Sequence, residues 1–330
     1  MKVLVTGAAG FVGSKVVSLL TGRADEVVGI DNLNAYYDIQ LKKDRLATFG
    51  GQMRFVQMDI CDAPAMDALF ARERFDAVVS LAAQVGVRHS FEAPAAYFHT
   101  NVDGLRQVLD CCRRYAVRHL VFASSSSVYG NARQVPFRED MPLGEPLSVY
   151  AGTKQQAEAL AASYARLYGM TVTALRYFSV YGPWGRPDMA PMLFARSIAQ
   201  GCPLQLYGEG KMLRDFTFID DIARGTVAVL DKGLAPEDGI RVPAAGTEGV
   251  FKIYNIGAGL PVALPDFIAL LEEALGRKAV IRYLPMQEGD AYRTWADTSL
   301  LERETGFRPQ VSLEEGVARF VRWFQSRSNS

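Results

Sequence analysis

The sequence predicts an α/β protein built on a doubly wound parallel sheet. Short apolar runs, rich in β-branched residues, recur through the first half of the chain without polar alternation, which is typical of strands buried on both faces. Amphipathic segments of helical length lie between several of these runs, and this order indicates parallel strands joined by right-handed crossovers. The expected strands are Val3–Thr6, Val27–Asp31, Arg54–Met58, Ala77–Leu81, Leu120–Ala123 and Thr171–Arg176. The expected helices among them are Gly10–Leu20, Ala65–Ala71, Tyr97–Tyr115 and Tyr150–Tyr168.

The rhythm of strand and helix breaks after Arg176. Residues 177–212 are rich in Gly and Pro and are predicted to form loops that carry polar and aromatic binding groups. We therefore expect a first domain over 1–176, with a return segment at 215–232, and a smaller α/β domain made mainly of 177–330. Further elements are expected at Asp220–Lys232 (helix), Phe251–Ile256 (strand), Leu264–Leu275 (helix) and Leu313–Gln325 (helix), with an exposed, mobile loop at 233–250.

Composition excludes several classes of protein. Lys+Arg and Asp+Glu both number 36 in 330 residues, so bulk charge favours neither nucleic acid nor a membrane surface as a partner. No apolar stretch approaches the ~20 residues needed to span a bilayer, and no signal peptide opens the chain, so we expect a cytoplasmic protein. The three histidines are scattered and the four cysteines form no CxxC pair, so we predict no metal site. The thiols are expected to be buried or half-buried in a reducing compartment.

The segment Gly7–Gly13 (GAAGFVG) follows the first expected strand and opens a helix. Glycines at this spacing allow a tight strand-to-helix turn and a close approach of the backbone to a pyrophosphate, which the helix N-terminus attracts. Asp31 ends the second strand, where a carboxylate accepts hydrogen bonds from ribose hydroxyls and repels a 2′-phosphate. These features predict a Rossmann-type domain that binds NAD rather than its phosphorylated form.

Two more strand ends carry candidate contacts. Asp59 and Ile60 follow the third strand and Leu81–Ala83 end the fourth, and ligands of open α/β sheets lie outside the carboxyl ends of strands. Asp59 is expected to contact the adenine, with a simple cap of the strand end as the alternative.

A tyrosine, a lysine and a serine run carry the predicted chemistry. Tyr150 and Lys154 are one helical turn apart, and an ammonium group beside a cationic nicotinamide lowers the pKa of a phenol towards that of a useful base. The alternative is an exposed Tyr and Lys on an amphipathic helix. Ser124–Ser127 end the fifth strand, and their hydroxyls would find partners in a sugar and the cofactor; the alternative is a polar turn.

The motifs TGAAGFVG, SSSSVYG and YAGTK together resemble those of the extended short-chain dehydrogenase/reductase family of nucleotide-sugar enzymes. Segments 31–38, 82–88, 176–189 and 214–221 resemble UDP-glucuronate 4-epimerases in particular. The resemblance covers most of residues 1–225 and, more loosely, the rest.

The resemblance implies roles for individual residues. Tyr150 would be the base, Lys154 its pKa modulator and a ribose ligand, and Ser125 the hydroxyl that hydrogen-bonds the reacting oxygen. Arg214 would meet the UDP diphosphate, with an ion pair to Asp215 as the alternative. The implied cofactor contacts are Gly7, Gly10, Phe11, Val12, Gly13, Asp31, Asn32, Asn34, Asp59, Ile60, Leu81, Ala82, Ala83, Gln84, Asn101, Ser124, Tyr150, Lys154 and Tyr177. The implied substrate contacts are Arg88, Ser125, Ser126, Ser127, Tyr150, Ser179, Arg186, Arg214 and Arg293.

The resemblance further implies the reaction. UDP-glucuronate and UDP-galacturonate would interconvert through a transient 4-keto sugar on enzyme-bound NAD, and the enzyme would be a homodimer that pairs the helices at 97–115 and 150–168. Related dehydratases and decarboxylases carry acidic residues where this chain has Ser126 and Ser127, so both of those reactions lose a candidate acid or base.

Arg186 is the candidate residue for substrate specificity towards a uronic acid. Its guanidinium would hold the C5 carboxylate with help from Ser179, and Arg88 is a second candidate cation. We expect these hydrogen bonds to keep the C5–C6 bond of the uronate out of alignment with the π system of the 4-keto group, which prevents loss of carbon dioxide. A salt bridge between Arg186 and Asp188 is the structural alternative. Other functions left open are a 4-epimerase for a neutral sugar such as UDP-glucose or UDP-N-acetylglucosamine, a UDP-glucuronate decarboxylase, and a non-enzymatic NAD-sensing protein.

Overall fold

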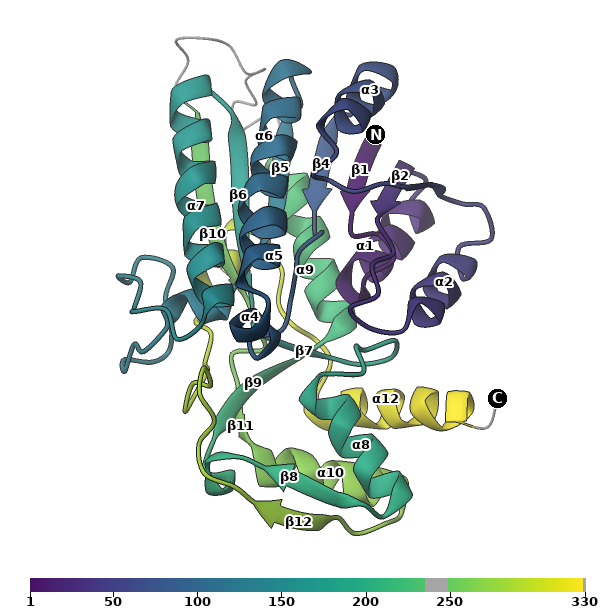
Figure 1. The fold of residues 1–330 in the computed structure, drawn as a ribbon, viewed down its shortest axis with the longest axis vertical. Coiled ribbons are helices and arrows are strands. Elements are labelled where there is room, and N and C mark those ends of the chain that lie inside the picture. Colours follow the sequence, from purple (N-terminus) through teal and green to yellow (C-terminus); the bar gives the residue numbers. More distant parts are fainter. Residues whose placement is uncertain (235–248, 329–330) are drawn as a thin grey trace.

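The computed structural model describes residues 1–234 and 249–328 (Figure 1). The exposed, mobile loop predicted at 233–250 therefore lies mostly outside the described residues. None of the described helices is long and apolar enough to cross a membrane.

A seven-stranded parallel sheet forms the larger part of the molecule, in the order β10-β6-β5-β4-β1-β2-β3. This confirms the predicted Rossmann-type class. The strands are β1 (Lys2–Thr6), β2 (Glu26–Asp31), β3 (Arg54–Gln57), β4 (Ala77–Ser80), β5 (His119–Ser125), β6 (Thr171–Tyr177) and β10 (Val250–Ile256). The seventh strand, β10, comes from the half of the chain assigned mainly to the second domain, and Ile253 lies opposite Ala174 of β6 in parallel register.

Helices cover both faces of this sheet, because alternate residues of each buried strand point to opposite sides. Val3 and Val5 of β1 belong to a core shared with α1 (Phe11–Gly22) and α9 (Ile219–Lys232). Leu4, between them, belongs to a second core shared with α3 (Ala63–Glu73), α6 (Leu105–Arg114) and α7 (Val149–Tyr168). The remaining helices of this half are α2 (Ile39–Ala47), α4 (His89–Glu92) and α5 (Pro94–Phe98).

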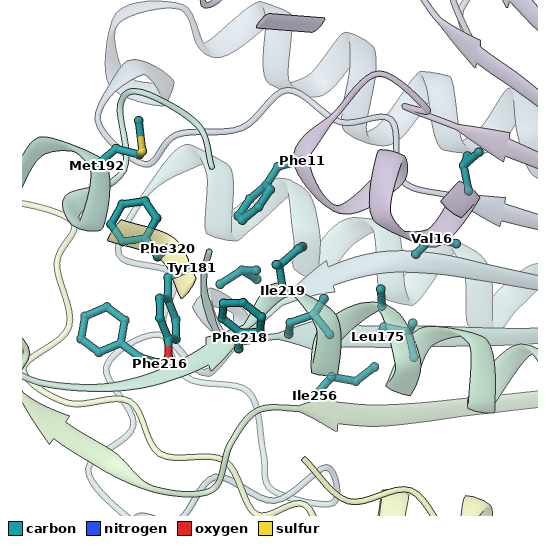
Figure 2. Packing of buried hydrophobic residues seen from close by; sticks show 14 of the residues in the cluster. Phe11, Val16, Leu175, Tyr181, Met192, Phe216, Phe218, Ile219, Ile256 and Phe320 are labelled. Atoms are coloured by element: carbon teal, nitrogen blue, oxygen red, sulfur yellow. The ribbon is translucent and has the colours of Figure 1, made fainter. Parts of the chain in front are cut away.

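The second part of the molecule lies below the sheet in Figure 1 and is built on two small sheets. Its strands are β7 (Ser179–Tyr181), β8 (Pro203–Leu206), β9 (Leu213–Phe218), β11 (Pro261–Ala263) and β12 (Val280–Tyr283). Its helices are α8 (Ala190–Gln200), α10 (Leu264–Leu275) and α12 (Leu313–Ser328), whereas α11 (Ser299–Thr305) packs against α9 and β10 of the larger part. Figure 2 shows that the two parts share one core, in which Phe11 of α1 and Ile219 of α9 lie in the same apolar cluster as Tyr181, Phe216 and Phe320.

Two expectations about local structure were wrong for physical reasons. The segment 177–212, predicted as loop, contains α8, because Pro191 occupies the first turn of that helix, where proline is tolerated, and Gly201 ends it in a left-handed conformation. The single helix predicted at 97–115 is interrupted by a π-helical stretch at His99–Gly104, within which the Asn101 side chain bonds to Gln84 and Thr153.

The helix α2 was not predicted, because its sequence is polar. Lys42 and Arg45 are its buried residues, so its inner face carries cations in place of an apolar stripe. All four cysteines are free, but Cys202 is exposed, contrary to the expectation of buried or half-buried thiols.

Candidate active site

A cavity opens at the carboxyl ends of the central strands, where open α/β sheets bind ligands. Most of the predicted site residues line it together. They are Gly7, Gly10, Phe11, Val12, Gly13, Asp31, Asn32, Asn34, Asp59, Ile60, Leu81, Ala82, Ala83, Gln84, Ser124, Ser125, Tyr150, Lys154, Tyr177 and Arg186.

The glycine segment is packed so closely that side chains are excluded. Gly7 has a φ of +70°, and a Cβ on it would lie 2.8 Å from the backbone nitrogen of Ala82. A Cβ on Gly13 would lie 2.0 Å from the carbonyl oxygen of Gly7. No side chain caps α1 at Gly10, and its first residues line the cavity, so its positive end is directed there. The residues present therefore fit the pyrophosphate of a dinucleotide.

Acidic side chains lie at the ends of β2 and β3, as expected. An Asp31 oxygen accepts from the N–H of Leu33 at 2.8 Å and lies 3.7 Å from Nζ of Lys42. Asp59 accepts from the amide of Asn32 and the N–H of Cys61, both at 2.8 Å. Although burial opposes ionisation, these donors hold the pKa of Asp59 below its ordinary value. Asp59 thus caps its strand end and lines the cavity as well.

The catalytic candidates meet on the other side of the cavity. α7 begins after Ser148, whose hydroxyl accepts from the N–H of Ala151, so Tyr150 sits in its first turn. Burial raises the pKa of Tyr150, while the Ser125 hydroxyl and the charge of Arg186 oppose that rise. Lys154 Nζ lies 5.9 Å from the centre of the Tyr150 ring and donates to the carbonyl of Ala123 at 2.8 Å.

Lys154 is buried and lies near a negative charge. Burial lowers the pKa of Lys154 to about 8, and the charge of Glu158 opposes that fall. The Ser125 hydroxyl and the charge of Arg186 act on the Tyr150 phenol as well, and the expected action of Lys154 on it stays a prediction.

The serine run is divided by its hydrogen bonds. The Ser124 hydroxyl donates to Glu158 at 2.5 Å, and the Ser125 hydroxyl accepts from the N–H of Ser127 at 3.1 Å. The Ser127 hydroxyl oxygen is buried and has no hydrogen-bond partner in the described part of the chain. Buried polar groups are rarely left unpaired, but Ser127 is not among the residues that line the cavity, so no ligand contact follows from this hydroxyl.

Arg186 lines the cavity and also forms the ion pair that was the structural alternative. Its Nε and Nη2 atoms donate to the two Asp188 oxygens at 3.0 and 2.6 Å. The Tyr36 hydroxyl donates to the same carboxylate at 3.1 Å. Nη1 of Arg186 donates to none of the described residues, so part of the guanidinium fork remains free.

Arg45 of α2 joins the loop of Arg186 to the glycine segment. Its Nη1 donates to the carbonyl of Ala9 at 2.9 Å and its Nη2 to the carbonyl of Trp184 at 2.6 Å. Trp184 has a φ of +67°, so this bond supports a strained turn two residues before Arg186.

Seven predicted contacts are not among the residues that line the cavity: Arg88, Asn101, Ser126, Ser127, Ser179, Arg214 and Arg293. Asn101 lies behind Gln84, which does line it. Arg88 is stacked 4.9 Å from the centre of the Tyr207 ring. Arg214 donates to the Leu213 carbonyl and the Met212 sulfur. Asp215 accepts hydrogen bonds from three backbone N–H groups of other segments, so the alternative ion pair between Arg214 and Asp215 does not form. Arg293 is bridged to Leu213, beside Arg214.

Sequence reasoning missed several residues that line the cavity, among them Tyr36, Tyr37, Lys42, Thr100 and Met189. Tyr36 and Tyr37 lie within the segment 31–38 that carries the resemblance, and that was the available signal. Within 1–234 and 249–328, no cluster of His, Cys, Asp and Glu is suited to hold a metal ion.

Comparison with known proteins identifies the family. The model of the NAD dependent epimerase/dehydratase family matches residues 3–257. The probable UDP-glucuronate 4-epimerase of Rhizobium meliloti is 43% identical, over 98% of this chain and 97% of its own length. The UDP-glucuronate 4-epimerase of Thermodesulfobacterium geofontis is 40% identical, over 97% of this chain and 95% of its own.

A solved structure agrees with these relatives. The UDP-glucuronic acid 4-epimerase of Bacillus cereus, crystallised with UDP-glucuronic acid and NAD, superposes with a TM-score of 0.89 at 33% identity, covering 99% of this chain and 100% of its own. With a glycine-lined cavity, a Tyr–Lys pair on α7 and relatives that match over nearly their whole length, the chain belongs to the NAD-dependent epimerase/dehydratase family.

Proposed function

We propose that the protein is an NAD-dependent UDP-glucuronate 4-epimerase, which interconverts UDP-glucuronate and UDP-galacturonate through a 4-keto sugar. The observation that carries the proposal is that Tyr150 and Arg186 line the same cavity as the glycine segment. The base (Tyr150), the cation for the carboxylate (Arg186) and the binding segment for the dinucleotide thus line one cavity.

The residues that would hold NAD are those of the glycine segment for its pyrophosphate, Asp31 for the adenosine ribose, and Lys154 for the nicotinamide ribose. Bound there, NAD would supply the hydride acceptor for oxidation at C4 of the sugar and, in reduced form, the hydride donor for its reduction.

The protein's own groups supply orientation and proton transfer. The Tyr150 oxygen takes the proton of the C4 hydroxyl and later returns it, and the Ser125 hydroxyl hydrogen-bonds the same sugar oxygen. Ionisation of Tyr150 must overcome its burial, and the positive charge of Arg186 assists it.

Arg186 is proposed to hold the uronate carboxylate through Nη1, while Asp188 fixes the opposite edge of the guanidinium. A fixed carboxylate is kept out of alignment with the 4-keto group, and decarboxylation is suppressed. The partial neutralisation of Arg186 by Asp188 is the one observation that favours a neutral sugar as substrate instead.

Incubation of the protein with UDP-glucuronate, followed by chromatographic separation of the products, tests the proposal. UDP-galacturonate is the expected product, and Tyr150→Phe should abolish its formation. Arg186→Ala should lower turnover of the acid and raise the share of UDP-pentose, whereas Arg186→Lys should lose less. Faster turnover of UDP-glucose than of the acid would instead establish a neutral-sugar epimerase, and a pentose as the main product of the parent protein would establish a decarboxylase.

We also propose a homodimer formed through α6 and α7. Phe98, Leu167 and Tyr168 are 42%, 62% and 38% exposed near or on these helices, and a partner's matching helices would cover them.

A further inference from the structure

A buried ionic network lies behind the floor of the cavity, where α7, β5 and β6 meet. Arg176 of β6 donates to both oxygens of Glu158 of α7, through Nε at 2.9 Å and Nη2 at 2.7 Å. The Ser124 hydroxyl at the end of β5 donates to the same carboxylate at 2.5 Å. Glu158 and Arg176 are only 4% and 2% exposed, so both charges depend on each other for stabilisation.

The far end of this network is held rigidly. Nη1 of Arg176 donates to the Tyr129 hydroxyl at 3.0 Å, and that hydroxyl donates to the side chain of Asn255 on β10 at 2.6 Å. Tyr129 and Asn255 are fully buried. Arg176 therefore has a fixed position, and it fixes the Glu158 carboxylate in turn.

The near end reaches the catalytic groups. Tyr150, Lys154 and Glu158 are spaced four residues apart along α7 and so share one face of the helix. Lys154 donates to the carbonyl of Ala123, and Glu158 accepts from the hydroxyl of the next residue, Ser124. The two side chains thus hold neighbouring residues at the end of β5, just before Ser125.

We propose that Glu158, held by Arg176, is a positioning residue that keeps Lys154 protonated and fixes the end of β5 beside Tyr150. The inference deepens the proposed function, because it rests on the roles given there to Tyr150 and Lys154. The direction of the electrostatic effects agrees, since the Glu158 charge raises the pKa of Lys154 against its burial.

Other charged and titratable groups around this site act differently. Arg186 faces Tyr150 from the loop after β7, and its positive charge lowers the pKa of the Tyr150 phenol against burial. Tyr177 of β6 is neutral at physiological pH, because burial raises its pKa strongly. Tyr97 of α5, whose ring centre lies 6.2 Å from that of Tyr150, has its pKa raised by burial as well. Glu158 is therefore the negative charge that supports Lys154.

Three variants test the proposal, because they are expected to change the pKa of Lys154 in different directions. Glu158→Gln removes the negative charge and leaves Arg176 unpaired, so the pKa of Lys154 should fall by about one unit. Arg176→Met leaves the negative charge without its cation, so the pKa of Lys154 should stay unchanged or rise. Glu158→Asp keeps the charge on a shorter side chain and should restore most of the parent pKa. A purely structural ion pair would instead make all three variants less stable with no ordered change in Lys154.

The first readout does not depend on turnover. In NAD-loaded protein grown with ¹³C-labelled lysine, the Lys154 Cε signal is assigned by its absence from Lys154→Arg and titrated by NMR. The second readout is the basic limb of the pH profile of kcat/KM for UDP-glucuronate, which should move to lower pH in Glu158→Gln only. Melting temperatures of all variants report folding.

The proposal is overturned if Glu158→Gln and Glu158→Asp shift the Lys154 titration equally, or if neither shifts it. Should Arg176→Met fail to fold, the comparison of the two Glu158 variants still decides the question. A parent protein that lacks uronate turnover would contradict the proposed function alone, because the NMR titration would still test Glu158.

Discussion

The contact between Gly13 and Gly7 gives a prediction whose size follows from the structure. A Cβ on Gly13 would lie 2.0 Å from the Gly7 carbonyl oxygen, whereas side chains essentially never approach within 3.0 Å, so Gly13→Ala must open the segment by about 1 Å. Gly7 has little room to retreat, because even a Cβ on it would lie 2.8 Å from the backbone nitrogen of Ala82, just after β4. The turn at Gly7 must therefore separate from the first turn of α1.

This separation has two measurable consequences. Overpacking of this kind costs about 1–3 kcal/mol of the unfolding free energy. It also disturbs the cradle of the pyrophosphate, and we expect NAD affinity to fall at least about tenfold, or ~1.4 kcal/mol. The assay is NAD released from the purified protein by acid, together with the rise in melting temperature on addition of NAD.

The matched control lies on the same helix. A Cβ on Gly22 would meet no atom within 4 Å, so Gly22→Ala should keep parent NAD content and gain up to ~1 kcal/mol of stability. If Gly13→Ala purified with the parent's NAD content and affinity, the steric reasoning about this segment would be wrong.

Three further predictions concern other parts of the molecule. Burial lowers the pKa of His119 to about 4, so as pH falls below about 6.5 the unfolded chain binds a proton before the folded protein does. Up to about 3 kcal/mol of unfolding free energy should therefore be lost between pH 6.5 and 4. Chemical denaturation across this range should show that the unfolding free energy of His119→Gln depends less on pH. Asp188→Asn should release one edge of Arg186 and lower kcat/KM for UDP-glucuronate about tenfold with a larger pentose fraction, and unchanged product ratios would contradict the positioning role of Asp188. Leu167→Asp should yield monomers in light scattering, while Leu260→Asp, at a side chain 71% exposed in the second part of the molecule, should leave the mass of the assembly unchanged.

Local sequence was sufficient wherever a short segment imposes its own conformation. The glycine segment predicted a tight turn and a dinucleotide cradle, because only residues without a Cβ fit its backbone contacts. The apolar runs predicted the parallel strands, since strands buried on both faces leave no polar alternation. The spacing of Tyr150 and Lys154 was enough to predict that both lie on one face of a helix, because residues four apart are separated by about one helical turn.

Tertiary structure decided which long-range partners these residues have. Sequence could not show that β10 joins the sheet beside β6, because pairing between distant strands leaves no local signal. It named Asp188 as an alternative partner of Arg186, but only the fold shows the ion pair and the exposure of Arg186 to the cavity together.

The electrostatics of the site show the same division most clearly. The sequence determined which titratable groups are present and that Lys154 lies one turn beyond Tyr150. Burial raises the pKa of Tyr150 against Ser125 and Arg186, and it lowers the pKa of Lys154 against Glu158; both the burial and these partners arise from strands and helices brought together across the chain. Charge–charge energies depend on distance and on the surrounding dielectric, and only the folded molecule fixes these two quantities.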